Sequence, residues 1–378
     1  MSKKLGAESR QQQQQTDNKI KLVEDAVFSA STLVNMAIYA VLEAPQELYF
    51  GSHSEKNLNV LEKIIIDTEI VENGKRVPVQ LVKPYFSPTK QRGIERRAIA
   101  YSIVKTKNGK LLPYYKYFNL SIDVTNTYEN GVPDPRDILT FLWGATWTRP
   151  TTYMRGRIGY GGGVAVQAIF ERKQRNRVEY NMYEMIEREE RREESTAQMI
   201  WIKEYAEPHL LIPVVRYGIL LGVENYEPHA MAYAFLQGLR LVGAGTPKGI
   251  DILEAYWISK NTEGGEKKEE EKEKVIVVDV GCWLLPEPVT ISPAIISPIE
   301  ALEEFKKKAL KYQQFSSSEP SAVFDEVKKG KAVRLVGNVA YEFLRKLADG
   351  FANNYLLKID KIEELNIPRV RTLQSQPR

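Results

Sequence analysis

The spacing of apolar and polar residues along the chain predicts both strands and helices. Dense apolar runs at Ile38–Leu42 and His209–Val223 are typical of strands. Helical spacing then covers Glu227–Val242, where Pro228 suits the first turn of a helix. Three further helical patterns follow, at Ile299–Tyr312, Ala322–Lys329 and Val339–Leu357. The last part of the chain is therefore expected to be mainly α-helical.

Turn-forming residues predict several hairpins. Asn73-Gly74 has the chemistry of a tight turn, and the triplet Ile64–Ile66 before it predicts a buried strand. A second hairpin is predicted at Asn108-Gly109, with Tyr101–Val104 as one of its strands. Glu263–Lys274, which is nearly all Gly, Glu and Lys, predicts an exposed hairpin loop.

The segment Met182–Tyr205 contains neither proline nor glycine and mixes acidic with basic residues. This pattern predicts a helix with a solvated face.

These elements suggest four parts. Residues 1–17 hold a run of glutamines and almost nothing apolar, so we expect a disordered tail. Residues 18–285 form the main body, with an exposed charged loop at 260–274. Residues 286–367 form a mainly helical C-terminal part, and residues 368–378 form a polar tail.

Composition bears on the compartment and on the partners of the chain. The single cysteine, Cys282, excludes an intrachain disulfide and a multi-cysteine zinc site, which fits a reducing cytoplasm. No apolar run approaches the roughly 20 residues of a membrane-spanning helix, so we expect no membrane partner. The net charge of +4 among 378 residues is too small to indicate a nucleic-acid partner, so the distribution of charge has to decide.

Two segments are strongly basic. Lys83–Lys116 contains nine basic residues and only one acidic residue, Glu95, with aromatic residues between them. Cations can meet phosphates while aromatic rings stack on bases, so this pattern indicates single-stranded nucleic acid. A basic surface on ordinary hairpins is the alternative. The candidate RNA contacts in this segment are Lys83, Lys90, Arg92, Arg96 and Arg97.

The second segment, Arg149–Arg177, joins arginines to the glycine-rich run Arg155–Gly163. Glycines allow close approach of a phosphate to the backbone, although a simple glycine-rich turn fits as well. The Lys-Ser/Thr ending of a P-loop is missing, so nucleotide hydrolysis is not indicated. The candidate RNA contacts in this segment are Arg155, Arg157, Tyr160, Gly161, Gly162, Arg172, Lys173 and Arg175.

A third glycine cluster, Gly243–Gly249, directly follows the helix predicted at Glu227–Val242. Lys248 within it is a candidate contact to an RNA backbone. A cap at the helix C-terminus explains the glycines equally well.

Catalytic motifs are weak. His209 and His229 each follow a proline beside apolar residues, which indicates partly buried histidines satisfied within the chain. No Ser, Cys or Asp motif marks a nucleophile. Asp123, Asp134 and Asp137 fit a metal site or ordinary turns. We therefore assign no catalytic residue, metal or cofactor.

Three segments together resemble a known family. They are Lys90–Arg97, the step Leu142-Trp143-Gly144 followed by Arg155–Ile158, and Gly238–Gly249. In this order they resemble the RAMP-superfamily backbone subunits of CRISPR type I effector complexes, the Cas-seven group, and they look most like the type I-D member. The resemblance spans Val41–Ile258. It departs from the family where no cysteine precedes Leu142 and where Ala244–Pro247 replaces the usual Arg-Thr pairing.

The resemblance implies an α+β fold, with an RRM-like (ferredoxin-like) antiparallel sheet as a palm, inserted finger and thumb segments, and a helical C-terminal part. It implies a subunit that polymerises along guide RNA (crRNA) and presents it to target DNA. The implied partners are guide RNA, target DNA through the guide, copies of the chain in a filament, and other CRISPR effector subunits. The alternatives are a stand-alone RRM-like RNA-binding or processing protein and a metal-dependent nuclease of single-stranded nucleic acid.

Overall fold

A central antiparallel sheet organises the chain. The computed structural model describes residues 32–49, 51–55, 58–72, 74–104, 138–148, 151–169, 182–189, 199–242, 249–258 and 271–356. The strands of the sheet run in the order β16-β15-β1-β11-β8, and β12 also pairs with β1. Their bounds are β1 Leu33–Glu43, β8 Ile158–Gly162, β11 Leu211–Gly222, β12 Asp251–Ile252, β15 Ile276–Gly281 and β16 Val333–Val336. The strands predicted at Ile38–Leu42 and His209–Val223 are thus β1 and β11.

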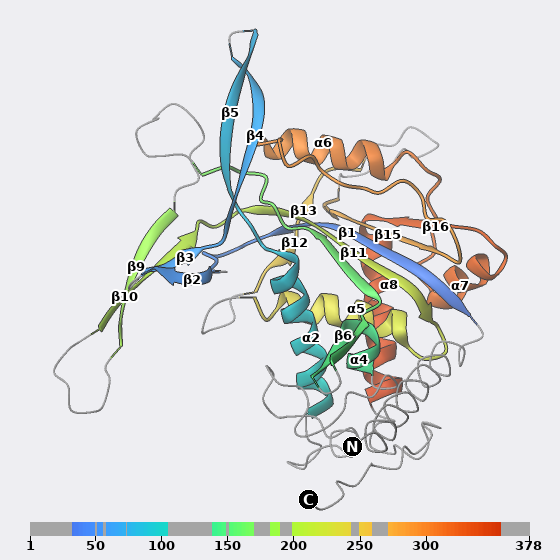
Figure 1. Cartoon of the computed structure of the whole chain (residues 1–378). Coiled ribbons are helices and arrows are strands. Elements are labelled where there is room, and N and C mark those ends of the chain that lie inside the picture. The colour runs from blue at the N-terminus through green and yellow to red at the C-terminus, as the bar shows by residue number, and fades with distance from the viewer. Residues whose placement is uncertain are drawn as a thin grey trace, which may run out of the picture.

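Helices cover both faces of this sheet (Figure 1). Helix α2 (Pro88–Val104) connects β1 to β8, and helix α5 (Glu227–Leu239) connects β11 to β15. Both helices lie on the same side of the sheet, together with α8 (Gly337–Gly350), whereas α6 (Pro298–Ala309) lies on the other side. The chain is therefore a mixed α/β fold. Along the chain, the central strands and the helices between them come in the order β1, α2, β8, β11, α5 and β15, with further elements inserted.

Burial of both faces explains the composition of β1. Met36, Ile38 and Ala40 pack into the core beneath α5 and α8, while Tyr39 and Val41 pack into a second core beneath α6. Successive side chains of a strand point to opposite faces, so a strand that is buried on both sides needs an almost continuous apolar run. The sequence of β1 has such a run.

The C-terminal part shares these cores. The helices predicted there are α6, α7 (Pro320–Lys328) and α8, and α8 continues into the short π-helix η1 (Phe351–Leu356). Helix α6 begins with Ser297, whose side chain accepts from the N–H of Glu300, and with Pro298 in its first turn. Strand β16, which the sequence did not predict, adds residues 333–336 to the edge of the central sheet.

A long hairpin of β4 (Lys63–Glu72) and β5 (Lys75–Pro84) projects from the body (Figure 1). It confirms the turn predicted at Asn73-Gly74, where Gly74 has a φ of 75°. The prediction of a buried strand at Ile64–Ile66 is wrong, because Ile65 is 60% exposed. Two strands that leave the body together have no second layer to bury their apolar side chains.

The helix predicted at Met182–Tyr205 is also wrong. This segment forms β9 (Met182–Glu189) and β10 (Met199–Ala206), which pair with each other and, through β3 (Leu58–Leu61), with β2 (Gly51–Glu55). Strand β10 contains two isoleucines, a tryptophan and a tyrosine, and β9 contains one tyrosine and one isoleucine, all of which favour β structure. That preference outweighs the absence of glycine and proline.

Smaller differences concern the loops. Tyr101–Val104 is the last turn of α2 and not a strand, and Asn108-Gly109 lies outside the described residues. Residues 260–270 of the predicted exposed loop lie outside the described residues. Its last two residues are not loop but strand β14 (Glu273–Lys274), which pairs with β13 (Glu254–Ala255), and Glu273 is buried. No helix in the described part of the chain is both long and apolar enough to cross a membrane.

A buried ion pair joins the C-terminal part to the sheet. Arg334 of β16 donates from Nε and Nη2 to the two carboxylate oxygens of Asp279 on β15, at 2.8 and 2.7 Å. Its guanidinium also donates to the carbonyls of Lys308 and Glu287, and both members of the pair are at most 1% exposed. The side chain of Arg334 thus connects β16 to β15, to the end of α6 and to the loop residue Glu287.

We predict that Asp279→Ala lowers the free energy of unfolding by about 3–5 kcal/mol, because it leaves the buried Arg334 charge unpaired. Chemical denaturation monitored by circular dichroism measures this loss. The control is Glu342→Ala, which breaks an exposed pair with Arg345 and should change stability far less. Equal effects of the two variants would contradict a central role for Asp279.

Candidate nucleic-acid interface

Helix α2 separates its basic residues from its core residues. Gln91, Ile94, Glu95, Ala98 and Ile99 are all buried. Residues three and four apart share a helix face, so the opposite face carries the remaining side chains of these turns. That face, which we call the arginine face, consists of Arg92, Gly93, Arg96, Arg97 and Tyr101.

Glu95 does not belong to this surface, because it pairs with Arg216 of β11 inside the protein. Arg216 Nε donates to Glu95 Oε1 at 2.5 Å, and its Nη1 donates to Gln91 Oε1. The side chains of Arg216 and Glu95 are 0% and 1% exposed. Burial raises the pKa of Glu95, and the Arg216 charge opposes that rise. The one acidic residue of the basic segment Lys83–Lys116 is therefore neutralised internally.

Tyr160 belongs to the same buried network. Its hydroxyl donates to Glu95 Oε2 and accepts from the indole nitrogen of Trp143, both at 2.7 Å. Burial raises the pKa of Tyr160 well above its usual value. Tyr160 was a candidate RNA contact, but its hydroxyl is occupied by protein partners. The residue instead connects β8 with α2.

The second motif of the resemblance joins α4 (Ile138–Trp143) to the hairpin of β6 (Gly144–Thr148) and β7 (Thr151–Arg155). Gly144 pairs with Arg155, and the N–H of Arg157 donates to the carbonyl of Leu142 at 2.9 Å. A Cβ atom at Gly156 would lie 2.6 Å from the carbonyl carbon of Trp143. Glycine at 156 therefore allows the two strands to meet.

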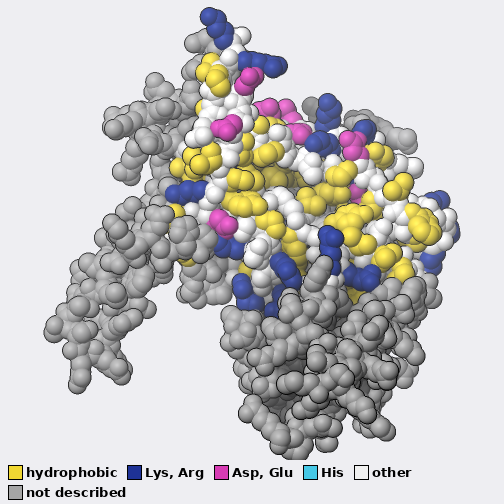
Figure 2. Space-filling view, in the orientation of Figure 1, with side chains coloured by type: hydrophobic (Ala, Val, Ile, Leu, Met, Phe, Trp, Pro, Cys, Tyr) yellow, Lys and Arg dark blue, Asp and Glu magenta, His cyan; other side chains and the backbone are white. Residues whose placement is uncertain are grey.

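This packing brings the two basic segments together. Arg92 Nη2 of α2 donates to the carbonyl oxygen of Trp143, next to the Gly144–Arg155 pair. Arg155 itself is exposed. In Figure 2, Lys and Arg side chains gather over the start of α2, below a band of hydrophobic side chains. Arg155 thus extends the arginine face.

Arg157 differs from its neighbour Arg155. Its guanidinium lies 4.6 Å from the ring centroid of Phe141, and burial lowers its pKa while Glu227 opposes that change. A partly buried cation that packs on an aromatic ring supports the fold directly. Arg157 therefore has a structural role besides any contact to RNA.

Two candidate lysines are engaged within the chain. Lys83 is 0% exposed, and its ammonium donates to the carbonyls of Pro293 and Ile295 at 2.7 and 2.5 Å. Burial lowers its pKa to about 8. The structure gives Lys83 no access to phosphate, so its assignment as an RNA contact is wrong. Lys90 is half-buried and pairs with Glu62 at 2.7 Å.

The glycines of β8 fall into two kinds. A Cβ atom at Gly161 would meet Val215 at 3.6 Å, an ordinary contact, so the fold tolerates a side chain there. At Gly162 it would lie 2.4 Å from the carbonyl oxygen of Pro213, and the φ of Gly162 is +70°. Gly162 is therefore required by the fold, whereas Gly161 leaves the backbone open to close approach.

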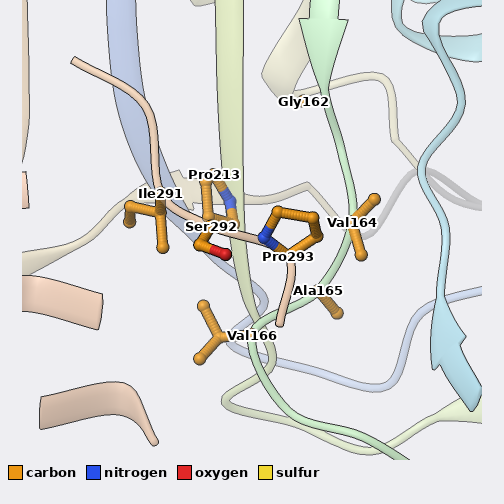
Figure 3. A pocket seen from close by; sticks show the side chains of 8 residues that line it. All are labelled: Gly162, Val164, Ala165, Val166, Pro213, Ile291, Ser292 and Pro293. Carbon is orange, nitrogen blue, oxygen red and sulfur yellow. The ribbon is translucent and has the colours of Figure 1, made fainter. Parts of the chain in front are cut away.

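A small apolar cavity lies beside Gly162 (Figure 3). Its volume is about 110 Å³. The side chains around it are uncharged, and they belong to Val164, Ala165, Val166, Pro213, Ile291, Ser292 and Pro293. Nothing in this lining would attract a phosphate, so the cavity does not extend the arginine face.

Four candidate contacts, Arg172, Lys173, Arg175 and Lys248, lie outside the described residues. The same holds for the aspartates at 123, 134 and 137. Among the residues that are described, no three His, Cys, Asp or Glu side chains gather as a metal site would require.

The two candidate histidines have different surroundings. His209 is exposed and lies 2.8 Å from Glu43, so the expectation of partial burial is wrong there. His229 is largely buried next to the rings of Tyr226 and Phe324, and burial lowers its pKa to about 4. Neither one lies beside a described nucleophile.

The chain is similar to several solved structures. No family model matches the chain, and no curated protein matches it. Among solved structures it is similar to Csc2 of Thermofilum pendens, with 12% identity and a TM-score of 0.36 over 92% of this chain and 93% of that one.

Two further similarities are to chains of CRISPR RNA-guided surveillance complexes. The first, in a pre-nicking state, shares 10% identity with a TM-score of 0.35 over 79% of this chain and 90% of that one. The second shares 11% identity with a TM-score of 0.33 over 85% and 99%. These structures belong to the same kind of protein that the three sequence motifs resemble.

We predict that Gly156→Ala lowers the free energy of unfolding by about 1–3 kcal/mol, because the added methyl group overlaps the backbone of Trp143. Gly159→Ala is the matched control, since its Cβ would lie 3.7 Å from the nearest atom, the Tyr217 carbonyl oxygen. Thermal and urea denaturation of both variants tests this difference. If Gly156→Ala were as stable as the control, the close contact between the two segments would be refuted.

Proposed function

We propose that the chain is a guide-RNA-binding backbone subunit of a CRISPR effector complex. The observation that carries the proposal is the arginine face of α2. It combines Arg92, Arg96 and Arg97 with Tyr101 and adjoins Arg155. Glu95, the one acidic residue of the segment Lys83–Lys116, is held in a buried pair and not on this face. Cations next to an exposed aromatic ring suit the phosphates and bases of a single strand.

The chemistry of the face suits a guide of any sequence. A subunit that coats RNA must hold its backbone and leave the base edges free for pairing with target DNA. Arginines and exposed backbone do this without reading sequence, whereas Asn, Gln, Asp or Glu side chains aimed at bases would discriminate among them. The arginine face contains no such side chain, and Gly161 offers an open stretch of backbone on β8.

The fold supports the rest of the proposal. Strands β1, β8, β11 and β15 with helices α2 and α5 follow the order and the antiparallel pairing of an RRM-like palm. The projecting β4–β5 hairpin would be the thumb-like segment, and the sheet of β2, β3, β9 and β10 would be a finger-like segment. In this proposal the partners are guide RNA, target DNA through the guide, further copies of the chain and other subunits of the complex.

The proposed role is binding without cleavage. A metal-dependent nuclease needs clustered oxygen or nitrogen ligands for its ion. Asp67, which lies in the same half of the sequence as the three candidate aspartates, is on the exposed β4–β5 hairpin and accepts from Gln80 at 3.1 Å, and no cluster of metal ligands is found among the described residues. A second candidate function, a stand-alone RNA-binding protein with an RRM-like fold, would use the same arginine face but would not form filaments.

We predict that the double substitution Arg96→Gln and Arg97→Gln weakens binding of single-stranded RNA. It should also reduce the slope of log affinity against log salt by about 1.4, since each lost phosphate contact on a single strand contributes about 0.7. Fluorescence anisotropy over a series of salt concentrations measures both quantities. Thermal stability should change little, because exposed and half-exposed charges contribute little to folding.

The matched control is Lys307→Gln, which removes an exposed cation on α6, on the other side of the sheet. It should keep the affinity and the salt slope of the wild type. If the double substitution behaved like this control, the arginine face would not be the RNA interface, and the proposed function would lose its main support.

A further inference from the structure

Gly93 occupies a position in α2 where the helix itself favours another residue. It lies inside a helix that runs from Pro88 to Val104. Glycine is among the least favourable residues in a helix interior, because its backbone loses the most freedom on folding. A reason for glycine at this position has to come from the surroundings.

The described part of the fold does not supply that reason. Among the described residues, a Cβ atom at Gly93 would meet only the end of the Arg97 side chain, at 3.4 Å, and a flexible guanidinium can move away. Gly238 of the neighbouring helix α5 shows the contrast. Its Cβ would lie 2.9 Å from Cγ and 3.2 Å from Cα of Glu95, so glycine there allows the two helices to approach. Gly93 has no such neighbour among the described residues.

The position is surrounded by charge. Arg96 and Arg97 lie three and four residues away and so share a helix face with Gly93, and the exposed Arg92, which precedes Gly93, borders that face. Arg97 forms no hydrogen bond or ion pair with any described residue, and its guanidinium lies beside Gly93. A bare piece of backbone between three cations fits an anionic chain that comes closer than a side chain would allow.

Tyr101 continues the row. Gly93, Arg97 and Tyr101 are spaced four residues apart, so they lie nearly in line along the helix, about 6 Å from one to the next. Tyr101 is 41% exposed and can present its ring to a base.

We infer that Gly93, Arg97 and Tyr101 form a nucleotide subsite in which the RNA backbone makes its closest approach to α2 over Gly93. Arg97 contacts a phosphate, and Tyr101 stacks on the neighbouring base. The inference rests on the arginine face of the proposed function and adds a steric requirement to its charge.

A pair of substitutions tests the steric requirement, because it moves stability and affinity in opposite directions. Gly93→Ala should raise the melting temperature by about 1–3 °C, since alanine favours the helix. It should weaken binding of a labelled single-stranded RNA, and Gly93→Leu should weaken it further, by about tenfold. The salt slope should stay that of the wild type, because no charge is removed.

Two controls separate the causes. Ser321→Ala, at an exposed position in the first turn of α7, should leave RNA affinity unchanged. Tyr101→Leu should lose about tenfold in affinity, and Tyr101→Phe should recover most of that loss, because an aromatic ring stacks on a base and leucine does not.

The possible failures are distinguishable. If Arg97→Gln weakens RNA binding but Gly93→Leu binds RNA as the wild type does, the subsite is wrong and the proposed function stands. If neither variant changes RNA affinity, the arginine face is not the RNA-binding surface and the proposed function loses its support. A lower melting temperature of Gly93→Ala would show that the fold needs this glycine, which overturns the inference. Loss of binding to an acidic partner protein with RNA binding intact would assign the face to that partner.

Discussion

The buried pair of Arg216 and Glu95 determines how α2 sits on the central sheet. An unpaired charge in a protein interior is far costlier than a paired one, so the two side chains have to meet. Arg216 comes from β11 and Glu95 from α2, and Tyr160 of β8 completes the network through its hydroxyl. Once Glu95 is directed inward, helical spacing turns Arg92, Arg96 and Arg97 outward. The same interaction therefore holds the helix and orients the surface proposed to bind RNA.

Much of the fold could be predicted where the apolar pattern is strong and long. Strands β1 and β11 and helices α5, α6 and α8 follow from runs that are buried on one face or on two. Prediction failed where tertiary surroundings decide. The charged segment that forms β9 and β10 pairs as strands, and Ile65 is exposed because its hairpin leaves the body. Local sequence carries no information on whether a second layer covers a strand.

The candidate site was predicted in part, and the errors have one physical origin. A count of charges along the sequence treats every lysine, arginine and glutamate as surface charge. Lys83 is buried against main-chain carbonyls, and Glu95 is buried against Arg216. The helical spacing of Arg92, Arg96 and Arg97 could show that they share a face, but only the structure shows that Glu95 faces away from them. The role of Gly156 also becomes visible only when Trp143 is placed beside it.

The proposed function requires that many copies of the chain coat one RNA. Native mass spectrometry of the protein with single-stranded RNAs of increasing length, at a salt concentration that permits binding, counts the copies on each RNA. A backbone subunit predicts that the number of bound copies rises in proportion to RNA length, with a constant number of nucleotides per copy. One or two copies on every RNA, whatever its length, would contradict the account and identify a stand-alone RNA-binding protein.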